Sequence, residues 1–452
     1  MLATVGQRIA AAFRATAPDP FVIAVLLTAF TFVLALVTTD TTPVQLIDDW
    51  ADPSNGIWKF LGFSMQMCLI LVTGHALAAA GPVALVLRKL ADLPQTGAQA
   101  AALVAFVAAS LGTLNWGLGL IAGALMARDV GRSLSRRNIP YHYPVLVAAG
   151  YVGLMVWHGG FSGTAPLKVS TAAQIADVLP PDVHLDPIPI TRTILSPMNL
   201  VITGGMVVLV PVIFAMLMPK SGESAPSTPA PGDGADETDR TPIIPRILEE
   251  TPIVNLLLAA MIAVWAWRYY FPAEGASGIR TLTPNSVNLT MLMLGLLLHR
   301  SPRSFLSAVE DGARGCAGII IQFPLYAGIM GMMHASGLTA ELASLLGRGS
   351  PTTLPLTTCV SAGVVNLFVP SGGGQWGVQG PIVIQSALDA GVPMPKMVMA
   401  LAYGDELTNM LQPFWALPLL AITGAKARDI VGYTAIAMAF GFVWTLGWLL
   451  VF

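Results

Sequence analysis

Long apolar runs alternate with short polar segments along almost the whole chain. A helix that crosses a membrane needs about 20 mostly apolar residues. The pattern predicts nine such spans, at 20–38, 57–80, 145–163, 198–218, 251–271, 287–299, 315–336, 398–420 and 430–452. We therefore expect an all-α membrane protein with about nine transmembrane helices.

Two more apolar segments, at about 95–129 and 352–388, do not fit this pattern. Each is too long for one span and is interrupted in its middle by glycine and polar residues. A pair of interrupted segments in corresponding halves of a chain is typical of transporters with discontinuous helices. We expect each segment to form a re-entrant hairpin.

The two halves of the chain resemble each other. "SLGTLNW" (Ser110–Trp116) lies 251 residues before "SAGVVNL" (Ser361–Leu367), and "YVGLMVWHGGFSGTAPL" (Tyr151–Leu167) lies 252 before "YGDELTNMLQPFWALPL" (Tyr403–Leu419). A fifth span precedes the second copy, which therefore starts from the opposite face. This predicts an inverted repeat, with a first repeat at 1–218, a flexible cytoplasmic linker at 219–250, a linking span at 251–271 and a second repeat at 272–452.

Composition supports a membrane location. Charged residues make up 11% of the chain, against about 25% in soluble domains. The predicted topology places 16 of the 23 Lys and Arg residues inside, in agreement with the positive-inside rule, with the N-terminus cytoplasmic. The three cysteines lie in apolar runs, so neither a disulfide framework nor a zinc site is expected. We also expect no cofactor and no nucleic-acid partner.

The stretch "NLFVPSGGGQWGVQGP" (Asn366–Pro381) contains the dinucleotide pattern G-x-G-x-x-G. A nucleotide loop needs a preceding strand in a βαβ unit, and the flanks here are apolar and helical. We interpret the stretch as an unwound hairpin tip, where bare backbone and helix N-termini bind an anion. The candidate substrate-binding residues of this tip are Ser371, Gly372, Gly373, Gly374 and Gln375.

Asn115 and Asn366 occupy equivalent positions at the two predicted tips. Their amides can bind a carboxylate or ligate a cation, and either can instead cap the broken backbone. We take both as substrate-binding candidates, together with the neighbouring Trp116. No metal site is predicted beyond one Na⁺ position considered near Asn115 and Asn366.

A polar cluster lies in "YGDELTNMLQP". On a helix Asp405, Asn409 and Gln412 share one face, and Pro413 then breaks the helix. Acids inside a membrane span usually mark ion or proton pathways, although a structural pair is the alternative. We assign Asn409 to substrate binding, and we assign ion coupling to Asp405, Glu406, Thr408 and Gln412.

The corresponding segment of the first half has no acid. It has His158 followed by Gly159 and Gly160, which favour a second broken helix. His158 is a candidate for substrate binding or proton transfer, and a neutral hydrogen bond between helices is the alternative.

The glycine-rich block and "YGDELTNMLQPFWALPLL" resemble the bacterial short-chain fatty acid transporter family, within the ion transporter superfamily. The resemblance implies a homodimer in the inner membrane and elevator-type movement. It also implies uptake of short monocarboxylates such as butyrate or acetoacetate, with substrate and Na⁺ held at the hairpin tips and broken helices. The sodium-coupled carriers have a Ser-Asn-Thr pattern at the tips. This chain keeps its Asn alone, which favours H⁺ over Na⁺.

We therefore expect a secondary active transporter that takes up short-chain monocarboxylates with a coupling cation, with its C-terminus in the periplasm. The alternative within the class is a carrier of dicarboxylates or other organic anions. An intramembrane enzyme would need a nucleophile with a base, or metal ligands, and His158 with Ser162 is its one candidate pair. We do not expect an enzyme.

Overall fold

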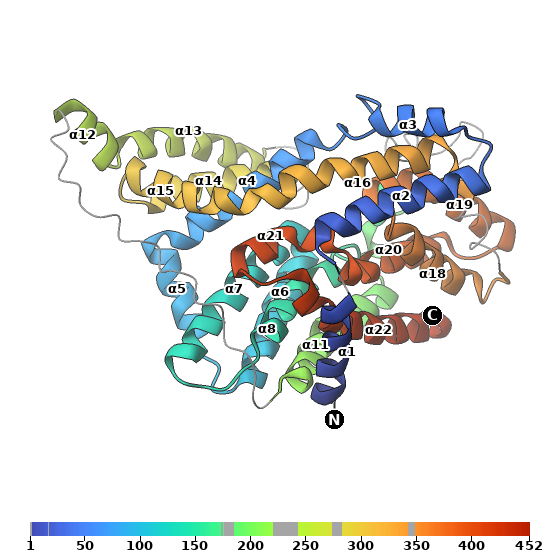
Figure 1. The fold of residues 1–452 in the computed structure, drawn as a ribbon, viewed down its shortest axis with the longest axis horizontal. Coiled ribbons are helices and arrows are strands. Elements are labelled where there is room, and N and C mark those ends of the chain that lie inside the picture. Colours follow the sequence, from blue (N-terminus) through green and yellow to red (C-terminus); the bar gives the residue numbers. More distant parts are fainter. Residues whose placement is uncertain are drawn as a thin grey trace.

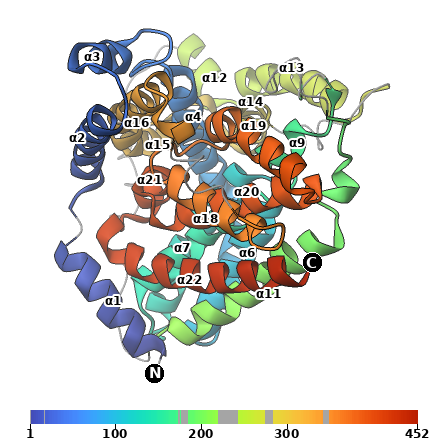
Figure 2. The ribbon, with the colours of Figure 1, turned by 90° about the vertical axis from the view of Figure 1, so that its right-hand side faces the viewer.

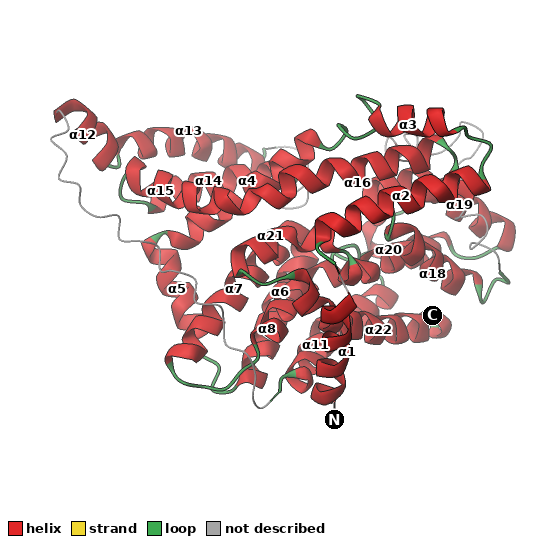
Figure 3. Cartoon of the chain, viewed as in Figure 1, coloured by secondary structure: helices red, strands yellow, loops and turns green. Residues whose placement is uncertain are grey.

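The computed structural model describes residues 2–16, 18–172, 175, 185–219, 243–273, 283–341 and 349–452. Within these ranges every regular element is a helix, as Figure 3 shows. The predicted all-α class is confirmed.

Seven helices in the described part of the chain are long and apolar enough to cross a membrane. This confirms a multi-pass membrane protein but not the count of nine spans. The seven are α2 (Pro20–Thr38), α4 (Leu61–Ala79), α6 (Gly97–Leu114), α11 (Pro197–Leu217), α13 (Ile253–Tyr270), the continuous helix Pro302–Ala335 and α22 (Ala427–Val451).

The described residues contain fewer long apolar helices than the nine predicted spans, and the differences have local causes. α14 (Pro284–Leu298) is apolar but short. The continuous helix joins a polar α15 (Pro302–Ala313) through the short η3 (Arg314–Cys316) to the apolar α16 (Ala317–Ala335). The regions predicted as spans at 145–163 and 398–420 are each divided by a break.

Both breaks occur where the residues favour them. In the first half α8 (Tyr143–Tyr151) continues into η1 (Val152–Met155), and an irregular loop at 156–163 leads to α9 (Thr164–Lys168). In the second half α20 (Met394–Thr408) continues into η4 (Asn409–Leu411) before α21 (Pro413–Thr423). Proline cannot donate a helical hydrogen bond but suits a first helical turn, which explains why α21 begins at its proline.

Two helix pairs occupy the segments predicted as hairpins. α6 is followed, after the single extended residue Asn115, by α7 (Trp116–Arg136). α18 (Leu354–Asn366) is followed by α19 (Gly372–Ala390). We call residues 114–116 tip 1 and residues 367–374 tip 2. The predicted interruptions are present at the predicted places, and re-entry into a membrane remains a prediction.

Shorter helices lie outside the predicted spans. They are α1 (Leu2–Thr16), α3 (Pro43–Ala51), α5 (Gly81–Ala91), η2 (Ile190–Arg192) and α12 (Ile243–Glu250). Most of the expected linker at 219–250 lies outside the described residues. Its last part, from residue 243, is the helix α12.

Figure 1 shows the helices in two layers. The long α16 runs through the upper layer with α2, α4, α13 and α14, while α6, α7, α8, α11, α1 and α22 form the body below. Seen from the end in Figure 2, α18, α19, α20 and α9 gather on one side, and α1 and α22 cross beneath them. In Figure 1, α20 and α21 of the second broken helix lie directly below α16, whereas α8 of the first lies within the body.

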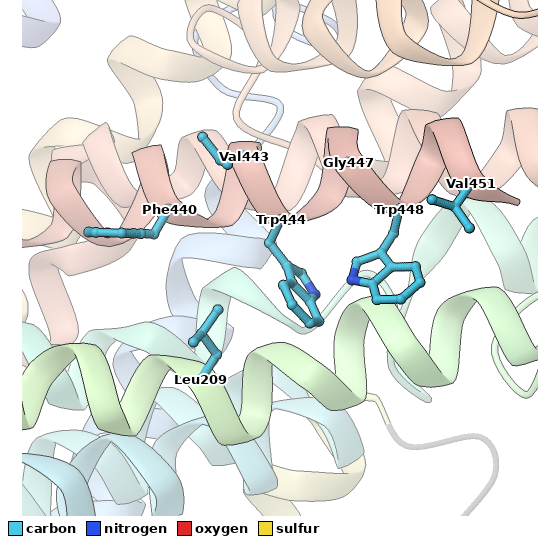
Figure 4. A pocket seen from close by; sticks show the side chains of 7 residues that line it. All are labelled: Leu209, Phe440, Val443, Trp444, Gly447, Trp448 and Val451. Carbon is cyan, nitrogen blue, oxygen red and sulfur yellow. The ribbon is translucent and has the colours of Figure 1, made fainter.

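A groove of about 350 Å³ lies on the outer surface between α11 and α22. Figure 4 shows that Leu209 of α11 faces a row of side chains from α22 across it, among them Trp444 and Trp448. Its lining is apolar throughout and includes none of the predicted site residues. Such a surface is expected where helices face lipid.

Glycines allow the central helices to approach closely. A Cβ on Gly404 of α20 would lie 1.9 Å from the carbonyl oxygen of Cys359 in α18, and one on Gly123 of α7 would lie 2.0 Å from that of Gly150 in α8. Small residues drive this kind of packing in membranes, because close backbone contact replaces the hydrophobic effect. The α18–α20 contact holds the second hairpin against the second broken helix.

We predict that Gly404→Ala destabilises the protein by about 1–3 kcal/mol, because the added methyl overlaps a backbone oxygen that cannot move alone. Thermal unfolding of the purified protein in detergent measures the effect. Gly62→Ala is the matched control, since a Cβ there meets nothing within 4 Å. Equal melting temperatures for the two variants would contradict the predicted close contact.

Candidate functional site

The two broken helices bind each other at their breaks. The hydroxyl of Tyr151, at the end of α8, lies 2.9 Å from the carbonyl oxygen of Asn409 and 3.0 Å from that of Gln412. The Asn409 side chain donates to the carbonyl of Leu154 at 3.4 Å. Carbonyls that the breaks leave without helical partners are thus satisfied from the other half of the chain.

Asn366 joins tip 2 to the second break. Its Nδ2 donates to the Asp405 carbonyl at 2.7 Å, the Asn409 Oδ1 at 2.9 Å and the Thr408 Oγ1 at 3.0 Å. In return the Gln412 side chain donates to the carbonyl of Asn366. Four residues predicted for substrate binding or ion coupling therefore meet Asn366 in one buried network.

Asn115 has a different role from Asn366 in this structure. Its Oδ1 caps α7 by accepting from the N–H groups of Gly117 and Leu118 at 3.0 and 3.1 Å. The N–H of Trp116 donates to Oγ of Ser162 at 3.1 Å. Side-chain oxygens of the protein therefore accept the first N–H groups of α7. Asn115 thus caps the broken backbone, which is the alternative that the sequence left open for it.

Tip 2 is packed on one side and open on the other. Ser371 caps α19 by accepting from the Gly374 N–H at 3.2 Å. A Cβ on Gly372 would lie 2.8 Å from the Trp157 ring and 3.1 Å from Cε1 of His158, whereas one on Gly373 would meet nothing within 4 Å. The open face of the tip is therefore at Gly373.

Gln375 lies inside the second hairpin. Its Nε2 donates to the carbonyl of Ala362 and to Oε1 of Gln379, both at 2.9 Å, while its own Oε1 has no partner. It faces α18 and is fully buried. In this conformation Gln375 holds the hairpin together.

The loop at 156–163 lies between the two tips. On one side the N–H of Phe161 donates to the Thr113 carbonyl beside tip 1 at 2.7 Å. On the other side Trp157 and His158 contact Gly372 of tip 2. The two rings stack on each other with centroids 4.3 Å apart. A movement of either tip therefore acts directly on this loop.

Both predicted acids point at the same loop. Oε2 of Glu406 accepts from the N–H groups of His158 and Gly159 at 2.7 and 3.0 Å. Oδ1 of Asp405 lies 3.0 Å from Nδ1 of His158, at an angle outside that of an ordinary hydrogen bond. The other oxygen of each carboxyl, Glu406 Oε1 and Asp405 Oδ2, is buried without a partner.

Electrostatic compensation at this cluster is incomplete. Among the described residues Asp405 and Glu406 are buried, and no Lys or Arg is buried with them. A buried carboxylate is costly unless it is paired and hydrogen-bonded. The cluster therefore suits an added proton or small cation.

Sequence reasoning missed three residues that position this site. Asn199 of α11 donates to the Gly159 carbonyl at 2.8 Å and accepts from the Tyr403 hydroxyl at 2.9 Å. Tyr151 holds the second break, as described above. A single Asn or Tyr in an apolar span carries little periodic signal, although an Asn at membrane depth indicates a hydrogen bond between helices.

An aromatic cluster surrounds the starts of α7 and α21. The rings of Trp116 and Trp415 are 5.2 Å apart, and Phe63 of α4 lies 6.3 and 5.9 Å from them. Phe414 stacks on Phe323 of α16 at 3.9 Å. The cluster joins α4 and α16 of the upper layer to tip 1 and the second broken helix.

No group of three His, Cys, Asp or Glu residues in the described ranges is arranged to hold a metal ion. The side-chain oxygen Oδ1 of Asn115 caps α7. The side-chain nitrogen Nδ2 of Asn366 donates to protein oxygens. A Na⁺ site near these two residues stays a prediction.

The whole chain resembles one known protein family. The family described as "Short chain fatty acid transporter" matches residues 1–452. This chain belongs to that family. The family resemblance is confirmed, and membership in a family of transporters confirms the expectation of a transporter rather than an enzyme.

Two relatives share the name "Putative short-chain fatty acid transporter". The protein of Escherichia coli is 40% identical over 440 residues, which cover 95% of each chain. The protein of Haemophilus influenzae is 38% identical over 430 residues, which cover 94% of each chain.

Two solved transporters were also found by structure. YdaH of Alcanivorax borkumensis has a TM-score of 0.44 at 17% identity and covers 96% of this chain and 97% of its own. MtrF of Neisseria gonorrhoeae has a TM-score of 0.37 at 11% identity, with 97% and 95% covered.

We predict that Glu406 stabilises the first break as an acceptor of two backbone N–H groups. Glu406→Met removes the acceptor at similar side-chain length, leaves both donors buried and should cost about 1–3 kcal/mol for each. Glu406→Gln keeps an oxygen at this position and should unfold at a clearly higher temperature than Glu406→Met. Equal melting temperatures would show that neither N–H depends on this carboxyl.

Proposed function

We propose that this protein takes up short-chain monocarboxylates across the bacterial inner membrane, driven by a coupled cation. The observation that carries this proposal is the contact between two broken helices beside two buried carboxyls, with no buried Lys or Arg among the described residues to partner them. The names of the family and of the relatives support the substrate class.

The substrate carboxylate binds at the starts of α19 and α21. Gly373 faces open space in the first turn of α19. Gln412 does not cap α21, so the N–H groups of Phe414 and Trp415 have no side-chain acceptor there. Each helix N-terminus supplies about half a positive charge, which suits one carboxylate. Ser371 caps α19, Asn366 and Asn409 hold the second break beside the start of α21, and Asn115 caps the start of α7.

The alkyl tail of the substrate lies against aromatic rings. Trp116, Trp415 and Phe63 meet beside the start of α21. A second carboxylate on this apolar side would lose its hydration without a partner, at a cost of several kcal/mol. A short monocarboxylate therefore fits better than a dicarboxylate or another organic anion of higher charge.

The coupling cation binds beside the second break. Asp405 Oδ2, Glu406 Oε1 and Gln412 Oε1 are buried oxygens without partners, and Thr408 Oγ1 lies in the same network. A proton or Na⁺ satisfies such oxygens and offsets the carboxylate charge. Because the tips lack the Ser-Asn-Thr pattern, we favour H⁺.

The transport movement is of the elevator type in a homodimer, with the N-terminus in the cytoplasm and the C-terminus in the periplasm. The aromatic cluster supports such a movement, because it joins the upper layer to tip 1 and the second broken helix through ring contacts, which can slide more easily than hydrogen bonds. The distribution of Lys and Arg supports the orientation.

Competition in proteoliposomes tests the substrate and the ion together. Unlabelled butyrate or acetoacetate should inhibit uptake of labelled butyrate far better than succinate, and chains much longer than six carbons should fail for lack of room. Opposed H⁺ and Na⁺ gradients should give accumulation that follows the pH gradient. Stronger inhibition by succinate than by butyrate would contradict the proposed monocarboxylate substrate. Uptake that needs Na⁺ at constant pH would contradict the proposed coupling to H⁺.

We predict that Gly373→Leu reduces butyrate uptake at least tenfold, because its side chain fills the open face of tip 2. The fold should be kept, since the Cβ meets no atom within 4 Å. Gly204→Leu in α11 is the matched control, because its Cβ also meets nothing within 4 Å. Normal uptake by a folded Gly373→Leu variant would make tip 2 a connector.

A further inference from the structure

The hydrogen bonds of His158 determine which of its ring nitrogens carries a proton. Its Nε2 accepts from the N–H of Ala165 at 3.0 Å. A backbone N–H can act only as a donor, so Nε2 has no proton in this conformation. A neutral imidazole then carries its proton on Nδ1, the nitrogen that lies 3.0 Å from Oδ1 of Asp405.

The groups around His158 allow one change in the charge of the His158–Asp405 pair, which is the protonation of the imidazole ring. The charged groups that face it are Asp405 and Glu406, both from α20. The charged residues of the packed helices α9 and α19 are Lys168 and Asp389, each near the far end of its helix. The ring itself is fully buried.

We propose that His158 is the group that carries the coupled proton and that its protonation releases tip 2. This inference rests on the proposed function, and it names the residue through which the cation acts. A proton that arrives at Nε2 converts the ring to an imidazolium, which has two donors and no acceptor. The Ala165 N–H then faces another N–H across 3.0 Å, and the two must separate.

The charge balance favours this step in the membrane. Neutral His158 beside an ionised Asp405 leaves one net negative charge on the pair, with Oδ2 of Asp405 unpartnered. Protonation of Nε2 brings the pair to zero net charge. Because an uncompensated buried charge is costly, a His158–Asp405 pair without net charge can cross with a monocarboxylate more easily than a pair that adds its own negative charge.

The packing carries the change to the tip. Ala165 lies in α9, whose first residue, Thr164, and His158 would both contact a Cβ on Gly372. α9 also packs on α19 and α20. When the bond to Ala165 breaks, the start of α9 moves against tip 2. The neutral ring therefore holds the packed face of tip 2, at Gly372, against the loop at 156–163 and the start of α9, and the imidazolium releases this contact.

His158→Gln tests this proposal, because a glutamine oxygen can reach the Nε2 position and accept from Ala165 but cannot bind the proton. His334→Gln is the matched control, since His334 is exposed at the end of α16. Two measurements are made on reconstituted protein. The first compares butyrate counterflow with butyrate accumulation driven by a pH gradient. The second measures amide hydrogen exchange in the segment 159–168 at pH values from about 8 to about 5, the range in which histidine usually changes charge.

The wild type and His334→Gln should accumulate butyrate with the pH gradient. Their exchange in 159–168, corrected for the intrinsic pH effect, should rise at least tenfold at the lower pH. His158→Gln should lose all gradient-driven accumulation while counterflow falls by less than tenfold, and its corrected exchange should not depend on pH.

Accumulation driven by the pH gradient in His158→Gln would overturn the proposal, as would pH-independent exchange of this segment in the wild type. If the wild type transports no butyrate, the proposed substrate is wrong, yet the exchange experiment still decides the role of His158. If His158→Gln does not fold, His158→Asn is used instead. Its shorter side chain places no acceptor at the Nε2 position, so the segment 159–168 should show high exchange at both pH values.

Discussion

The structure depends on one constraint: helices that break inside a membrane must find protein partners for the backbone groups that the break exposes. Here each half of the chain supplies partners for the other. Tyr151 donates to carbonyls of the second break, and Glu406 accepts N–H groups of the first. The cross-half contacts join residues 247 to 261 positions apart in sequence, close to the offset of the repeat, which supports the proposed inverted repeat.

This mutual dependence explains why the breaks are suited to transport. Two segments at the breaks also contact the hairpin tips. Asn366 binds the second break from the end of α18, and the loop at 156–163 contacts both tips. A ligand that changes one contact therefore changes the balance of the others, without a separate transmitting element.

The prediction of the fold was strongest where physical demands are local. The apolar runs predicted α2 at its observed bounds, 20–38, and glycine and proline predicted both tips and the second break. Hydropathy alone does not determine the number of spans, because it averages over a window. It cannot distinguish a helix that crosses the membrane from two short helices joined by a break, as at 145–163 and 398–420.

The sequence by itself determined the fold class, the interrupted segments and the residue types of the candidate site, because these follow from period, composition and the limits on proline and glycine. Only the tertiary structure decided which of these residues meet. It separated Asn115, which caps its own helix, from Asn366, which binds the opposite break. It also placed Ala165 against Nε2 of His158. Such pairings depend on contacts between distant segments, for which a single sequence has no local signal.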